Sequence, residues 1–93
     1  MSALSAGSAT LARVATSTTV ATLLAASGTR RMAVIYNDAA GALYVKFGAT
    51  ATSTDFTVKI AGGGYFELPS PMYTGAITGI LDTGTGNAQV TSY

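Results

Sequence analysis

Apolar and polar residues alternate along several short segments of this chain, and the alternation limits the folds open to it. The clearest case is AVIYNDAAGALYVKFG at 33–48, where two alternating runs flank a short polar break. Successive side chains of a β-strand point to opposite faces, so a period of two residues indicates strands with one buried face. Asn37 and Asp38 favour turns because their side chains bond to nearby backbone. The stretch therefore predicts a β-hairpin.

Seven segments after residue 18 carry this strand pattern, with turn residues between them. They are 19–26, 31–36, 42–48, 55–61, 65–68, 76–81 and 88–92. In the fourth, the pattern directs Phe56, Val58 and Ile60 inward. Short strands about 8–12 residues apart are typical of antiparallel sandwiches and small barrels. We predict an all-β domain over residues 19–93, an antiparallel β-sandwich of about seven strands.

The wiring of this sandwich stays open among Greek-key, jelly-roll and immunoglobulin-like. The Cys…Trp…Cys pattern of a true immunoglobulin domain is missing, since the chain has neither residue. The segment VATLLAA at 20–26 predicts a strand rather than the apolar part of a signal peptide. Thr22 interrupts it, and Arg13 is the only basic residue before it.

Residues 1–18 differ from the rest, being small and polar with isolated apolar side chains at Leu4, Leu11 and Val14. We expect an extended N-terminal arm. Such an arm either reaches over a neighbouring subunit or is a frayed terminus.

The composition limits the core that the domain can bury. Ala, Gly, Ser and Thr make up 51 of the 93 residues, whereas Leu, Ile, Val and Phe make up 20, and no cysteine is present. Each large apolar side chain contributes roughly 1.5–3 kcal/mol when buried, and ordering the backbone costs about 1–2 kcal/mol per residue. We therefore expect a homo-oligomer, in which association with its own copies or another protein supplies part of the stability.

Charge is scarce, at 10% of residues with a net charge of +1, against about 25% charged residues in an average soluble domain. Arg30 and Arg31 form the only basic pair, so the basic patch of a nucleic-acid-binding protein is missing. The apolar run at 20–26 is far shorter than the roughly 20 residues that span a membrane. We expect no nucleic-acid or membrane partner.

Few side chains can perform chemistry. Without His or Cys, the chain cannot build Ser-His-Asp or Cys-His sites, or zinc sites with nitrogen or sulfur ligands. The acids Asp38, Asp55, Glu67 and Asp82 are each alone in sequence. The glycine-rich stretches 60–69 and 82–87 predict turns rather than phosphate or calcium loops, the second as a hairpin turn. We expect no enzyme activity, no cofactor and no metal.

The candidate functional residues are apolar and aromatic. Tyr65 and Phe66 are neighbours on one strand and point to opposite faces, so one of them remains outside a one-sided core. We expect that residue to form an exposed patch with Met72 and Tyr73, and such patches often mark interfaces. The predicted interface residues, including those of the arm, are Leu4, Leu11, Val14, Tyr65, Phe66, Met72 and Tyr73.

Four sequence motifs occur in a fixed order along the chain: R…IYND, LYVKFG, FTVKIAGGGYFELP and YTGAITGI. With a Thr-rich first strand before them, residues 14–81 resemble small virion proteins of tailed bacteriophages. The resemblance implies a β-sandwich structural protein, assembled in the host cytoplasm into the phage particle. A decoration or cement protein, bound in many copies to the major capsid protein, is the first expectation. A neck, collar or tail protein is the alternative, and a carbohydrate- or receptor-binding module is the alternative of another class.

Overall fold

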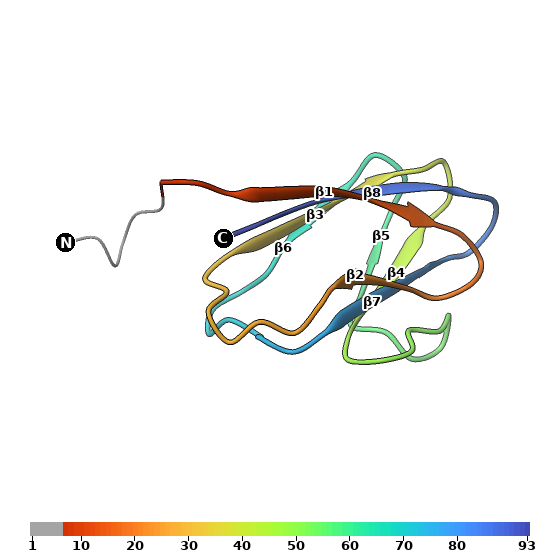
Figure 1. Ribbon diagram of the computed structural model, residues 1–93. Helices are drawn as coiled ribbons and strands as arrows, with labels where there is room; N and C mark the ends of the chain where they lie inside the picture. Colours follow the sequence, from red (N-terminus) through yellow and green to blue (C-terminus); the bar gives the residue numbers. More distant parts are fainter. Residues whose placement is uncertain (1–6) are drawn as a thin grey trace.

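A computed structural model describes residues 7–93 as two antiparallel four-stranded sheets packed face to face (Figure 1). Sheet A has the order β1-β8-β3-β6, and sheet B has the order β2-β7-β4-β5. The fold is therefore the predicted all-β sandwich. The strands are β1 (Thr10–Thr16), β2 (Ala21–Leu24), β3 (Ala33–Asp38), β4 (Leu43–Phe47), β5 (Val58–Ile60), β6 (Tyr65–Glu67), β7 (Ile77–Leu81) and β8 (Gly86–Ser92).

The strand order shows which connectivity the sandwich has. The first strand pairs with the last, and the chain passes from one sheet to the other at nearly every connection. Eight strands in two sheets of this order form a jelly roll. An immunoglobulin fold instead places its first two strands side by side in one sheet.

The chain joins the sandwich earlier than the predicted boundary at residue 19. β1 lies within the predicted arm of residues 1–18 and pairs with β8 along its whole length. Residues 10–16 are extended, as predicted, but they form the first strand of sheet A and bring the described strands to eight. Leu4 lies outside the described residues.

The predicted hairpin at 33–48 is wrong. β3 pairs with β8 and β6 in sheet A, whereas β4 pairs with β7 and β5 in sheet B. The same correction applies to 82–87, which carries the chain from β7 across to β8. A hairpin and a connection between sheets both need two alternating strands around a polar break, so the local sequence does not separate them.

Asn37 shows how the crossing between β3 and β4 is held. Its side chain is fully buried, and its Nδ2 donates to the carbonyl oxygens of Gly41 at 2.8 Å and Ile60 at 2.9 Å. The backbone N–H of Asn37 donates to Gly64 O, and Gly63 N–H donates to Asn37 O. Asn37 therefore ties two connections of the sandwich together, a different role from the local turn expected of it.

The core lies between the sheets and consists of the inward side chains of both. Its largest fully buried apolar members are Ile35, Leu43, Ile77, Val45 and Val90. Small residues leave room for the larger core side chains: a β-carbon at Gly79 on β7 would lie 2.9 Å from Cδ1 of Leu23 on the neighbouring strand β2. Such close packing matches the scarcity of large apolar residues in the sequence.

The connection between β4 and β5, residues 48–57, folds back over the outer face of sheet B. Thr78 on β7 holds it, accepting a hydrogen bond from Ala51 N–H at 3.0 Å and donating one to Gly48 O at 2.8 Å. Ala51 is buried there. The connection thus covers the outer face of sheet B around Thr78 and Tyr44, whereas Thr22 and Lys59 on the same face stay exposed.

Phe56, predicted to point inward, lies at the end of this same connection. Its ring packs against Tyr44, on the outer face, with ring centroids 4.8 Å apart. The inward prediction is wrong because β5 begins only at Val58, so the alternation does not extend back to residue 56.

Candidate protein-binding surface on sheet A

The outer face of sheet A is built from side chains that alternate with the core residues. On β3, Ala33, Ile35 and Asn37 are buried, while Tyr36 and Asp38, which flank Asn37, are exposed. Across the strands, the register places Arg13, Gln89, Tyr36 and Tyr65 in one row. In contrast to sheet B, no segment within residues 7–93 pairs with or folds over this row. The row is therefore uncovered within the described structure.

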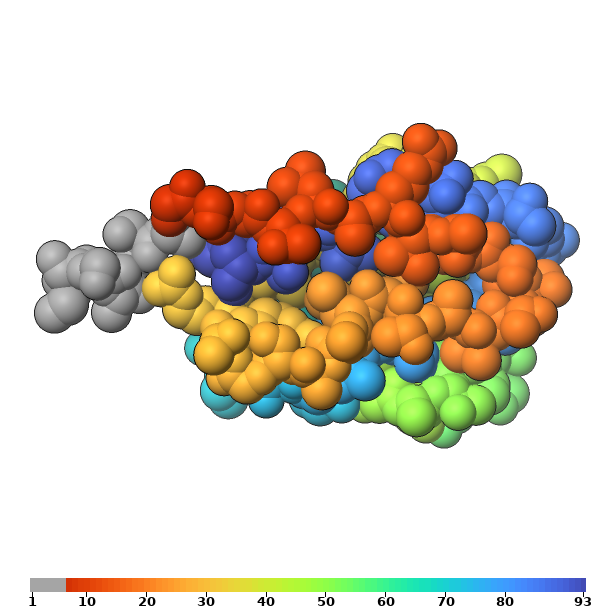
Figure 2. All heavy atoms as spheres, in the orientation of Figure 1, coloured from red at the N-terminus to blue at the C-terminus, as the bar shows by residue number. Residues whose placement is uncertain are grey.

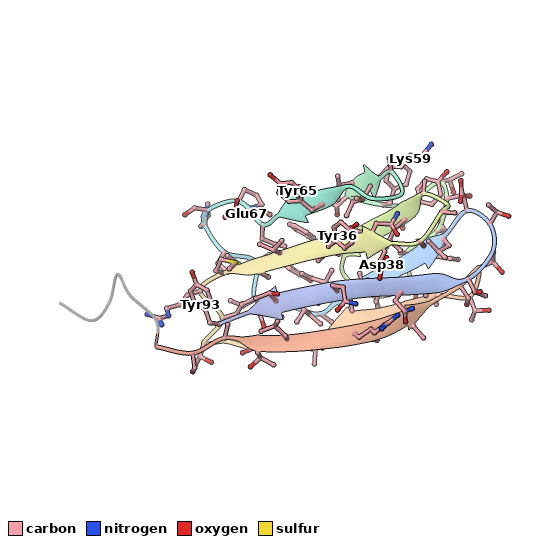
Figure 3. All side chains as sticks on the ribbon, turned by 90° about the horizontal axis from the view of Figure 1, so that it is seen from above. Tyr36, Asp38, Lys59, Tyr65, Glu67 and Tyr93 are labelled. Atoms are coloured by element: carbon pink, nitrogen blue, oxygen red, sulfur yellow. The ribbon has the colours of Figure 1, made fainter. Side chains whose placement is uncertain are left out.

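Two tyrosines lie side by side on the β3–β6 half of this face (Figure 3). Tyr36 on β3 and Tyr65 on β6 are directly opposite each other, with 39% and 70% of their surface exposed. Opposite residues in an antiparallel pair have β-carbons about 4.5–5.5 Å apart, so the two rings share one patch. Phenol rings give an apolar surface with a polar end, a combination that is enriched in binding sites.

Polar and charged groups surround the tyrosines. Glu67 lies opposite Val34, one row from Tyr36, and Asp38 lies on the other side of Tyr36 along β3 (Figure 3). Arg13 and Gln89 complete the row toward β1. These strands thus place one basic and two acidic residues on this face. This set of charges differs from the basic stripe of a nucleic-acid-binding protein.

The structure separates the predicted interface residues. Tyr65 and Leu11 are exposed on the outer face of sheet A, with Leu11 75% exposed. Val14 is half-buried against the core. The rows that contain Leu11 and Tyr65 are adjacent, because Leu11 lies opposite Thr91 in the row next to that of Arg13.

Phe66, Met72 and Tyr73 pack instead against the core. The rings of Phe47 and Tyr73 stack with centroids 5.0 Å apart, and those of Phe47 and Phe66 lie 6.2 Å apart. The expected exposed patch of Met72 and Tyr73 with one residue of the Tyr65–Phe66 pair is therefore not formed. Phe66 points inward from β6, and the irregular segment after residues 69–71 places Met72 and Tyr73 against the core, away from the face that carries Tyr65.

Sequence reasoning missed Tyr36, Gln89 and Asp38 as parts of one surface. The alternation in 31–36 did place Tyr36 on the face opposite Ala33 and Ile35, as observed. The alternation does not show which residues lie beside Tyr36, because these neighbours come from strands about 30 and 50 residues away along the chain.

Arg30 is buried and has a structural role. Its guanidinium donates to the carbonyl oxygens of Ala25 at 2.6 Å, Tyr73 at 2.7 Å and Gly75 at 3.2 Å. It joins the connection after β2 to the connection before β7 at one end of the sandwich. A hollow of about 210 Å³ beside it is lined in part by Thr10, Leu24 and Tyr93.

Residues 7–93 contain no group of three or more His, Cys, Asp or Glu side chains placed to hold a metal ion. They also contain no helix long and apolar enough to cross a membrane.

Comparison with known protein families, curated proteins and solved structures finds no match to this chain.

Proposed function

We propose that this protein is a non-enzymatic structural protein that binds another protein through the outer face of sheet A. The observation that carries the proposal is the contrast between the two outer faces. Residues 48–57 cover part of the outer face of sheet B, whereas sheet A presents Tyr36, Tyr65 and Leu11 to solvent. Tyrosine is enriched in protein interfaces, and exposed apolar groups rimmed by polar ones mark docking surfaces.

The resemblance to small virion proteins of tailed phages leads us to propose also where in the phage particle the protein binds. The partner would be the major capsid protein, with the present chain bound in many copies as a decoration protein. The low charge supports this reading, because residues at the centre of an interface are depleted in charge. A position at the neck, collar or tail is the alternative.

The test measures binding to purified phage heads by co-sedimentation. Tyr65→Ala removes an exposed ring and leaves the core intact, so we expect normal folding by circular dichroism and a loss of head binding of at least tenfold, since interface tyrosines often cost 2 kcal/mol or more on truncation. Thr54→Ala, on the connection that covers sheet B, is the matched control and should bind normally. Equal binding by both variants would contradict the proposal. Copy number per particle, from quantitative mass spectrometry, separates the shell from the neck or tail.

A specific observation also favours the carbohydrate-binding alternative. The tyrosines that can stack on sugar rings have Asp38, Glu67 and Gln89 on the same face. These side chains accept or donate hydrogen bonds of the kind that sugar hydroxyls make. A glycan array separates the two candidates: binding lost in Tyr65→Ala supports the sugar function, and an array without signal removes it.

A further inference from the structure

The four edge strands of the sandwich differ in how well they are protected. β2 has four residues with an irregular register against β7, and β5 and β6 have three residues each. Pro69 and Pro71 follow β6 closely. Short strands, irregularities and prolines are the usual means by which proteins prevent edge-to-edge pairing. These three edges are therefore poor templates for another strand.

β1 has none of these protections. Its seven residues, TLARVAT, contain no Pro or Gly, and its register against β8 is regular throughout. Within residues 7–93, no strand pairs with its outer edge. In Figure 2 this edge faces the viewer as the red atoms at the upper front of the molecule. Alternate N–H and C=O groups along it are consequently available to a partner strand.

The first half of β1 is also exposed on both faces. Thr10, Leu11, Ala12 and Arg13 are all exposed, although Thr10 and Ala12 point to the side of sheet B. Thr16 on that same side is buried. Sheet B therefore covers the end of β1 near Thr16 but leaves residues 10–13 uncovered. The hollow of about 210 Å³ lined by Thr10 and Leu24 lies beneath these residues.

We propose that two copies of this chain pair through β1, antiparallel, about a two-fold axis normal to sheet A. The two four-stranded sheets would become one continuous sheet with β1 beside β1 at its centre. Such an interface is isologous, so a single self-complementary edge is sufficient to close the assembly. A second copy is the occupant because β1 is a long regular edge with one charge, and the same edge on its partner offers the matching backbone groups.

The single charge of β1 selects the register. Pairing centred on Arg13 would place the two Arg13 side chains directly opposite each other, which is destabilising. Pairing centred on Ala12 places Arg13 opposite the partner's Leu11, so that the arginine stem covers the exposed leucine. It also uses the half of β1 that is exposed on both faces. We therefore assign the Ala12-centred register.

The dimer stands on the edge geometry and does not depend on the proposed function. The dimer would nevertheless strengthen the proposed binding, because both tyrosine patches would lie on the same side of the continuous sheet. Two linked patches on one assembly raise the apparent affinity for a repetitive partner surface. The contact itself is small compared with standard protein interfaces, so we expect a reversible dimer that dissociates on dilution.

Sedimentation velocity over a concentration series tests the pairing. We expect the unmodified chain to shift from monomer to dimer with increasing concentration. Ala12→Lys sets two like charges face to face and should remain monomeric, with an unchanged circular dichroism spectrum because position 12 is exposed. Thr54→Lys adds the same charge on the connection that covers sheet B and should dimerise normally. A monomeric unmodified chain, or a dimer in Ala12→Lys, overturns the proposal.

A cysteine placed at Ala12 tests the register directly, because the chain has no cysteine of its own. In the assigned register the two Ala12 positions are opposite each other, within the Cα separation that a disulfide accepts. Mild oxidation should give a covalent dimer for Ala12→Cys and little for Thr54→Cys. Equal yields would overturn the register. Head binding by a monomeric Ala12→Lys variant would show that the two proposals fail or succeed separately.

Discussion

Asn37→Ala is the sharpest test of the way the sheets are joined. The Asn37 side chain is fully buried, and its Nδ2 serves two carbonyl oxygens, those of Gly41 and Ile60. Because both partners are acceptors, the amide can be placed only with its nitrogen toward them. Truncation leaves both carbonyls without this donor in a crowded corner of the sandwich.

The magnitude follows from the two lost hydrogen bonds. An orphaned buried polar group costs about 1–3 kcal/mol. The loss is partly offset because Asn37 Oδ1 is itself buried without a partner, and truncation removes it. We expect a loss of about 2–4 kcal/mol, which is a large part of the roughly 5–14 kcal/mol that stabilises a domain of this length. The midpoint of thermal unfolding should fall by about 10–25 °C.

Urea denaturation followed by circular dichroism measures this loss, with Asp38→Ala as the control. Asp38 is the exposed neighbour on β3, so its truncation should cost less than about 0.5 kcal/mol. Asn37→Asp separates two roles. Asp favours turns as Asn does, so a local turn role predicts little change. The observed contacts predict a loss at least as large as that of Asn37→Ala, because a carboxylate would face two carbonyl oxygens. A stable Asn37→Asp protein would refute the role of Asn37 in the crossing.

Three further substitutions test contacts that hold the connections. Arg30→Lys replaces a fork that reaches three carbonyl oxygens with a single ammonium, and should lower the urea-unfolding free energy by about 1–3 kcal/mol. Thr78→Val removes both hydrogen bonds to the connection over sheet B and should speed amide hydrogen exchange at Ala51, while exchange in sheet A stays unchanged. Lys46→Ala breaks the surface ion pair with Asp55, N to O 2.6 Å, and should change stability by less than about 1 kcal/mol; a larger loss would show that the pair does more than an exposed salt bridge does.

The sequence by itself determined the all-β class and, apart from β1 and the start of β5, where the strands lie. Period-two alternation is a local property, and a strand exposes alternate residues whichever strand lies beside it. Ala33 and Ile35 lie on one face of β3 and Tyr36 on the other, as the pattern predicts, and the structure shows that the first face is buried. The scarcity of large apolar residues likewise predicted a thin core, and the absence of His and Cys limited the chemistry before any fold was known.

Only the tertiary structure decided which strands are neighbours. The polar break at 37–42 suits a hairpin as well as a crossing, and the choice depends on partners far along the chain: β8 for β3 and β7 for β4. Residues 10–16, predicted to be part of an arm, form strand β1 because they pair with β8, which is distant in the sequence. The tyrosine face also exists only because β3 and β6 lie side by side, which places Tyr36 opposite Tyr65. Strand pairing joins distant residues through backbone groups that every residue shares, so short stretches of sequence do not specify it.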